Sequence, residues 1–235
     1  MLGKQNVIEV TLFAEGYFDF STNNPDMFNA ASEIMKSFKD SKPHYLPSTN
    51  HQMQYLRFLP TKKNYVVSFG RGVITISFLS KSPNDSFDQQ TMKKHMSKLF
   101  SLINEKLDLK FSSFKIEKDS VFTELNPSIV DNACNGTIIP KRFGDYNDWE
   151  LALHKRIHDS KSISDNSYLS LSKRIVSSTL LINGERVLST YFTLITDPAN
   201  KAARYNCLDT LSFFDMGLEI VNSEEESFNE TWRNE

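Results

Sequence analysis

The sequence contains only two cysteines, and neither belongs to a recognisable motif. Cys134 and Cys207 lie in unrelated contexts and form no CxxC pair. This pattern excludes a disulfide framework and a paired-cysteine zinc knuckle. The N-terminus also lacks a signal-peptide pattern, so we expect a reduced, cytoplasmic chain with two free thiols.

Long apolar runs and a strong excess of one charge are also missing. No run of eighteen apolar residues occurs, so the sequence predicts no membrane span. The formal net charge is -2, which argues against a disordered tail and against a protein that coats nucleic acids. The 235 residues are enough for one large domain or two small ones with a hydrophobic core.

The charge is spread unevenly along the chain. The last stretch has one arginine and six glutamates, a net charge of -5: Arg233 against Glu219, Glu224, Glu225, Glu226, Glu230 and Glu235. The rest of the chain then holds 27 - 1 = 26 basic and 29 - 6 = 23 acidic residues, a net charge of +3. Such asymmetry indicates either a charged partner surface or solvated helix faces.

Hydrophobic periodicity in the first half alternates between the period of a strand and that of a helix. Segments with strand period are Val7–Phe13, Met53–Leu59, Tyr65–Phe69, Val73–Leu79 and Leu109–Leu125. Helical spacing follows Asn24-Pro25 and recurs at Met92, Met96, Leu99, Ile103 and Leu107. Because Ser41–Asn50 contains Pro43 and Pro47, we predict a loop there.

This order of elements is close to the βαββαβ order of a ferredoxin-like layer, an antiparallel sheet with two helices on one face. We therefore predict an α+β fold whose ferredoxin-like half covers residues 1–125. Residues 126–144 form the connection, and residues 145–235 form a second α+β half. The alternative is one continuous domain.

The second half is predicted to contain a helix, a hairpin and a long terminal helix. Trp149, Leu153 and Ile157 give Asp145–His158 a helical face. Asn183-Gly184 between Tyr168–Ile182 and Arg186–Ile195 is a strong hairpin signal, because both turn positions favour a positive φ. A helix over Asp209–Arg233 carries an apolar stripe broken by Glu225, and we expect its glutamates to face water.

One helical spacing resembles a metal site. On a helix, steps of four residues place Glu150, His154 and His158 along one face, where they could share a divalent ion. The pattern is not the HExxH motif of metalloproteases, and Lys155 and Arg156 beside it disfavour a cation. We weigh a metal-dependent hydrolase or nuclease at these residues against a plain polar helix flank, which is favoured.

A ferredoxin-like sheet also raises the question of RNA binding. Tyr55, Arg57, Tyr65 and Phe69 could lie on the sheet, with Lys62 and Lys63 in a turn. The sequence lacks an RNP-type run, and the aromatic residues are more simply explained as core. Nucleic-acid binding is therefore an alternative that we do not favour.

No Walker loop, dinucleotide fingerprint, nucleophile elbow or Ser/His/Asp grouping is present in the sequence. We therefore expect a non-catalytic interaction or assembly protein that needs no cofactor and binds a protein partner or a second copy of itself. The candidate contact surface is the apolar stripe of the terminal helix, formed by Leu211, Phe214, Leu218, Val221, Phe228 and Trp232.

The order of segments resembles a sporadically distributed family of uncharacterised bacterial proteins of about this size. The similar features are the Val7–Val10 strand, the meander ending in Val73–Leu79, the helix to Leu107, and a terminal helix with Phe228 and Trp232. The resemblance implies a bacterial or mobile-element origin and transfers no site residues. Sporadic distribution would fit a defence or toxin–antitoxin type locus.

Overall fold

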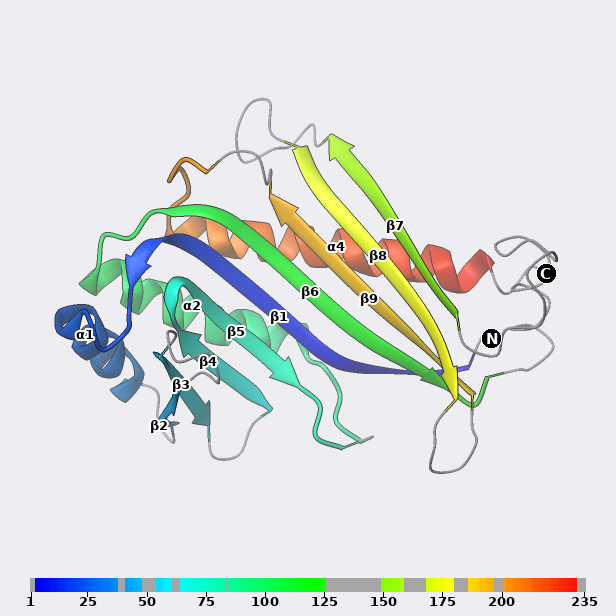
Figure 1. Ribbon diagram of the computed structural model, residues 1–235, viewed down its shortest axis with the longest axis horizontal. Coiled ribbons are helices and arrows are strands. Elements are labelled where there is room, and N and C mark those ends of the chain that lie inside the picture. Colours follow the sequence, from blue (N-terminus) through cyan, green and yellow to red (C-terminus); the bar gives the residue numbers. More distant parts are fainter. Residues whose placement is uncertain are drawn as a thin grey trace.

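A nine-stranded antiparallel sheet organises the chain in the computed structural model (Figure 1). The structure describes residues 3–37, 41–47, 54–60, 64–82, 84–125, 149–158, 168–179, 186–196 and 201–231. The strand order is β2-β3-β4-β5-β1-β6-β9-β8-β7. The elements are β1 (Lys4–Asp19), α1 (Pro25–Lys36), β2 (Ser41–Pro47), β3 (Gln54–Pro60), β4 (Tyr65–Phe69), β5 (Arg71–Leu79), α2 (Gln89–Lys106), β6 (Phe111–Thr123), β7 (Trp149–His158), β8 (Tyr168–Thr179), β9 (Arg186–Thr196) and α4 (Cys207–Thr231).

The predicted α+β class, the antiparallel sheet and the C-terminal helix are confirmed. The sheet is larger than a four-stranded ferredoxin-like layer, because β2 and β3 extend one side and β7, β8 and β9 extend the other. Strands from both predicted halves belong to this one sheet, since β6 pairs with β9 and Ile116 lies opposite Leu194. The predicted β8–β9 hairpin pairing is confirmed, while its turn at Asn183-Gly184 lies outside the described residues.

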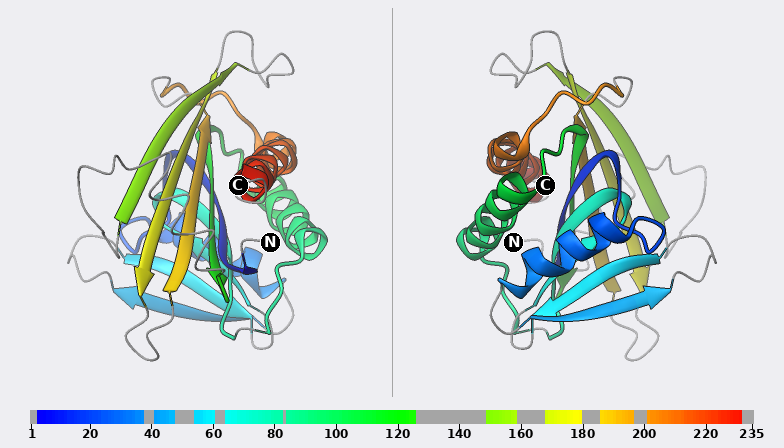
Figure 2. Two further views of the ribbon diagram at one scale, coloured as in Figure 1. Left: turned by 90° about the vertical axis from the view of Figure 1, so that its right-hand side faces the viewer. Right: turned by 90° about the vertical axis from the view of Figure 1, so that its left-hand side faces the viewer.

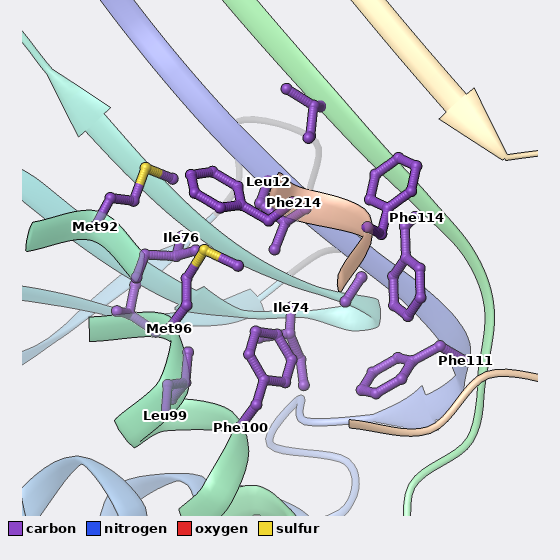
Figure 3. Close-up of a cluster of buried hydrophobic side chains, with 14 of the residues drawn as sticks. Leu12, Ile74, Ile76, Met92, Met96, Leu99, Phe100, Phe111, Phe114 and Phe214 are labelled. Atoms are coloured by element: carbon purple, nitrogen blue, oxygen red, sulfur yellow. The ribbon is translucent and has the colours of Figure 1, made fainter. Parts of the chain in front are cut away.

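The helices α1, α2 and α4 lie on one face of the sheet, which we call the inner face (Figure 2). The opposite face is called the outer face. Inward side chains of the strands and apolar side chains of all three helices form one core. Figure 3 shows Phe100 of α2 beside Ile74 of β5, and Phe214 of α4 beside Leu12 of β1. Within the described part of the chain, no helix combines the length and apolar composition needed to cross a membrane.

Local sequence signals explain several element boundaries. The Asn24 side chain caps α1 by accepting a hydrogen bond from the Met27 amide, and Pro25 occupies the first helical turn, where no amide donor is needed. A tight turn joins β4 to β5, and in it the Gly70 amide donates to the carbonyl of Val73 at 2.8 Å. Gly72 there adopts a φ of +74°, which glycine tolerates without a steric penalty.

The predicted loop over Ser41–Asn50 is wrong for its first seven residues, which form β2. Pro43 lies opposite Phe58, and Pro47 lies opposite Gln54 of β3. Proline is tolerated here because β2 is the last strand on its side of the described sheet, and only one side of an edge strand needs amide donors.

The predicted helix over Asp145–His158 is also wrong, because residues 149–158 form β7. Apolar residues alternate with polar ones along this segment, and Leu151 fits a period of two but not the predicted helical face. Pairing with β8 along the whole length of β7 then favours the strand.

Candidate functional site

The residues of the predicted metal site lie along β7 rather than along a helix. Steps of four residues keep Glu150, His154 and His158 on one face of the sheet, because strand side chains alternate with period two. A strand rises by about 3.3 Å per residue, so successive members are separated by roughly 13 Å. Metal ligands bind at about 2 Å from the ion. Spacing along a strand therefore separates the three positions that helical spacing would gather.

Two of these side chains have partners on the neighbouring strand β8. The Arg174 guanidinium contacts both carboxylate oxygens of Glu150, with Nε–Oε1 and Nη2–Oε2 distances of 2.7 and 3.0 Å. The Nδ1 atom of His154 lies 2.8 Å from the Ser172 hydroxyl. Among the described residues, no group of three histidine, cysteine or acidic side chains could hold a metal ion.

The strand β7 is instead the end of the sheet on its side, since β8 is its only neighbour among the described strands. Most of its side chains are solvent-exposed, including Glu150, Ala152, His154 and Arg156 on the outer face. On the inner face, Leu153 is 49% exposed. An edge strand presents unpaired amide and carbonyl groups, so β7 is a template to which another strand can add.

The apolar stripe of α4 is part of the chain's own core. Phe214, Leu218, Val221 and Phe228 are buried, and Leu211 packs against the core cluster, while Trp232 lies outside the described residues. In Figure 3, the ring of Phe214 lies close to Leu12, which comes from the central strand. The stripe that the sequence offered as a partner surface is therefore covered by the chain's own sheet.

A buried ion pair joins α4 to the sheet at the position where the stripe is interrupted. The ammonium of Lys118 on β6 donates to a carboxylate oxygen of Glu225 at 2.5 Å and to the Asn222 side-chain oxygen at 2.7 Å. The other Glu225 oxygen accepts a hydrogen bond from the Thr190 hydroxyl at 3.2 Å. The side chains of Lys118 and Glu225 are only 7% and 4% exposed. The expectation that the glutamates of this helix face water is therefore wrong for Glu225.

A second lysine lies beside this pair on β8. The Lys173 ammonium sits 4.6 Å from the centre of the Phe228 ring and 5.3 Å from that of Phe192. Burial lowers the pKa of Lys173, and the nearby Glu224 and Glu225 oppose that effect. Since the network joins α4 to β6, β8 and β9, it fixes the position of the helix on the sheet. Its lysine and glutamate side chains are almost fully buried between the helix and the sheet, which is the setting of a structural ion pair.

The outer face carries a group of carboxylates at its centre. Burial raises the pKa of Asp119 on β6 to about 6, and the negative charges of Glu9 and Glu117 add to the effect. The Lys115 ammonium lies 2.9 Å from Glu117 and over the Phe13 ring. This concentration of negative charge disfavours the binding of nucleic acid at the centre of the outer face.

Two of the residues proposed for RNA binding lie in the core. Tyr65 and Phe69 are buried in the core, which supports the simpler core interpretation. Tyr55 and Arg57 belong to β3, of which only the backbone is described, and Lys62 and Lys63 lie outside the described residues.

The exposed side of α2 has a shallow hollow of about 520 Å³, lined by Gln90, Lys93, Lys94, Ser97, Lys98, Ser101 and Leu102. Two of its lysines have partners, one in α4 and one directly after the end of α1. Lys93 forms an ion pair with Asp215 of α4, and Lys98 donates to the backbone carbonyl of Ser37 at 2.7 Å. The hollow is thus a solvated basic surface in which two cations are already engaged.

No family model, curated protein or solved structure matches the chain. The edge strand β7 is the feature that sequence reasoning missed, and the signal that could have revealed it is the alternation of apolar and polar residues over Trp149–His158.

Proposed function

We propose that the protein is a non-catalytic assembly protein that binds another polypeptide by strand addition at β7. The single observation that carries this proposal is the ten-residue edge strand with exposed side chains on both faces. Added strands gain affinity from backbone hydrogen bonds, and their alternate side chains give specificity. The proposed function needs no cofactor and no metal.

Natural edge strands are usually protected against unwanted pairing by charges, prolines or bulges. Within β7, Glu150, Lys155 and Arg156 supply charges, but proline is absent and the pairing with β8 runs without interruption. Leu153 also leaves apolar surface exposed at the centre of the strand. The edge is therefore not fully protected against pairing, and its charges favour a partner strand of complementary charge.

We further propose that β1, β4, β5 and β6 with α1 and α2 constitute a ferredoxin-like unit to which the other strands were added. The order β4-β5-β1-β6 supports it, because α2 connects β5 to β6 across β1, and α1 leads from β1, by way of β2 and β3, to β4 on the far side of β5. The strands β9, β8 and β7 then extend this unit and bring the edge to the surface. The family resemblance would place the assembly in the bacterial cytoplasm, in a defence or toxin–antitoxin type system.

Photo-crosslinking tests strand addition at β7. The full chain is produced in its host with p-benzoylphenylalanine in place of His154, which is exposed on β7. The matched control carries the same group in place of Ser97, which is exposed on α2. We expect one discrete crosslinked species from position 154 and none from position 97.

Hydrogen exchange of the purified crosslinked species then distinguishes strand addition from other contacts. We expect added protection at the amides of β7 and unchanged exchange on α2, because new backbone hydrogen bonds form only at the edge. Equal crosslinking at both positions, or no added protection at β7, would contradict the proposal.

A further inference from the structure

Residues of opposite charge lie on the two sides of the centre of β7. Glu150 lies three residues before Leu153, and Arg156 lies three residues after it. Both belong to the outer face, because Lys155 between them points to the inner face, where its ammonium lies 3.0 Å from Glu224 of α4. The strand thus has a negative end and a positive end on one face, with an exposed leucine at the midpoint of the other.

We propose that the partner at β7 is a second copy of the chain, whose β7 pairs antiparallel about a two-fold axis at Leu153. This inference rests on the proposed strand addition at the same edge. Directly opposite residues of an antiparallel pair share a face, so Glu150 of each copy meets Arg156 of the other. Ala152 meets His154, and the two Leu153 side chains cover each other.

Other registers lose this match. An offset by one residue places the helices of the two copies on opposite sides of the joined sheet. In one direction it sets Arg156 against Trp149 and Glu150 against Lys155, which already binds Glu224, and in the other it sets Glu150 against Ile157. An offset by two residues moves Glu150 away from Arg156. Parallel pairing brings like charges together, since each residue lies near its own equivalent. The antiparallel pairing centred on Leu153 forms both Glu150–Arg156 ion pairs and buries the two Leu153 side chains against each other.

The existing partners of these side chains are compatible with the dimer. Glu150 already binds Arg174, and a second guanidinium from the other copy would flank the same carboxylate. Arg156 lies 5.0 Å from the centre of the Tyr168 ring and is otherwise exposed. Neither contact has to break for the new ion pair to form.

Charge exchange within one chain gives a direct test. Sedimentation velocity of the purified full chain is expected to give the mass of two 27.0 kDa chains. Arg156→Glu, which keeps the Glu150–Arg174 pair, should weaken dimerisation at least tenfold, and Glu150→Arg should do the same. The triple variant Glu150→Arg/Arg156→Glu/Arg174→Glu should restore the dimer, because opposite charges again face each other across the interface and between positions 150 and 174. Lys94→Glu on the exposed side of α2 is the matched control and should leave the mass unchanged.

A disulfide trap tests the register independently. In a background with Cys134→Ser, Leu153→Cys should form a disulfide-linked dimer on mild oxidation, because the two residues lie opposite each other within the reach of a disulfide. Ala152→Cys should not, since its equivalent in the other copy is two residues out of register. Equal crosslinking of the two variants would overturn the register.

The outcomes separate the two proposals. A monomer that crosslinks to a different polypeptide through position 154 would overturn the homodimer and leave strand addition intact. A dimer that ignores both charge reversals would also overturn the inference. A monomer without any crosslink at position 154 would overturn both proposals.

Discussion

Charged side chains on the two faces of the sheet are stabilised in different ways, and β6 contributes side chains to both faces. Phe114, Ile116 and Lys118 point inward beneath α4, while Lys115, Glu117 and Asp119 point outward. On the covered inner face, the only charged member has a carboxylate partner. On the outer face, burial raises the pKa of Asp119, and the negative charges of Glu9 and Glu117 add to this effect. A charged side chain on the covered face therefore needs an oppositely charged partner. On the outer face, a carboxylate can instead lose its charge by binding a proton.

Truncation of Phe214 should have the largest effect, because this ring is fully buried between α4 and the inner face. Phe214→Ala is expected to lower the free energy of unfolding by about 3–5 kcal/mol. Urea denaturation followed by circular dichroism measures the change. Leu208→Ala is the matched control on the same helix, since Leu208 is 71% exposed, and it should change stability by less than about 0.5 kcal/mol. Equal effects of the two substitutions would show that α4 does not pack on the sheet.

Breaking the buried ion pair should cost nearly as much. Lys118→Ala leaves the Glu225 carboxylate buried without its cation, and a cost of about 3–5 kcal/mol is expected. The double variant Lys118→Met/Glu225→Leu should recover most of the loss, because two apolar side chains of similar volume replace both charges. A double-mutant cycle in urea separates the pair energy from the loss of packing. If the double variant is as unstable as Lys118→Ala, the unpaired charge is not the cause.

On the outer face, Asp119 should have a smaller effect on the free energy of unfolding, and this effect depends on pH. Its folded pKa of about 6 exceeds the ordinary value of 3.8, so the folded state binds more protons between these values. Stability contributed by this group is therefore present below about pH 4 and lost as the pH rises through about 6. Asp119→Asn removes the ionisable group and with it this loss of stability. Because solvent screens the partly exposed carboxylate, the variant should be more stable by only about 1 kcal/mol near pH 7.

Urea midpoints of Asp119→Asn and the unmodified chain at two pH values check this sign. The difference should favour the variant near neutral pH and disappear near about pH 3.5, where the unfolded and folded carboxyl groups are both protonated. A gain that persists at the acid pH would come from a change in packing or hydrogen bonding and would contradict the electrostatic account.

The sequence predicted the regions in which one periodicity dominates. Met92, Met96 and Leu99 on α2 follow helical spacing, and each is buried as expected. The β8–β9 pairing was also predicted, because a strong turn signal separates two strand patterns. The long α4 was predicted from its stripe, but the surface that this stripe packs against was not. Periodicity identifies an apolar face and does not say which other element covers it.

The prediction failed where the spacing satisfied two periods at once. Steps of four between Trp149, Leu153 and Ile157 fit one helical face and one strand face equally well, because four is close to 3.6 and a multiple of two. Leu151 was the residue that distinguished them. The same ambiguity produced the metal hypothesis, since Glu150 and His154 repeat at the same interval. The identity of β7 as an edge depends on long-range pairing with β8, which local patterns do not encode.

The smallest expected effect belongs to His154, and it tests whether β7 behaves as a strand. His154→Ala removes one contact with the Ser172 hydroxyl at an exposed site, so stability should change by less than about 0.5 kcal/mol. Titration calorimetry with Zn²⁺ should give the same weak binding for the variant and for the unmodified chain, because the strand separates the three side chains. A stoichiometric ion that is lost in both His154→Ala and His158→Ala would require these residues to converge. Such convergence would bring the helix and the metal-dependent hydrolase back as the better account of this segment.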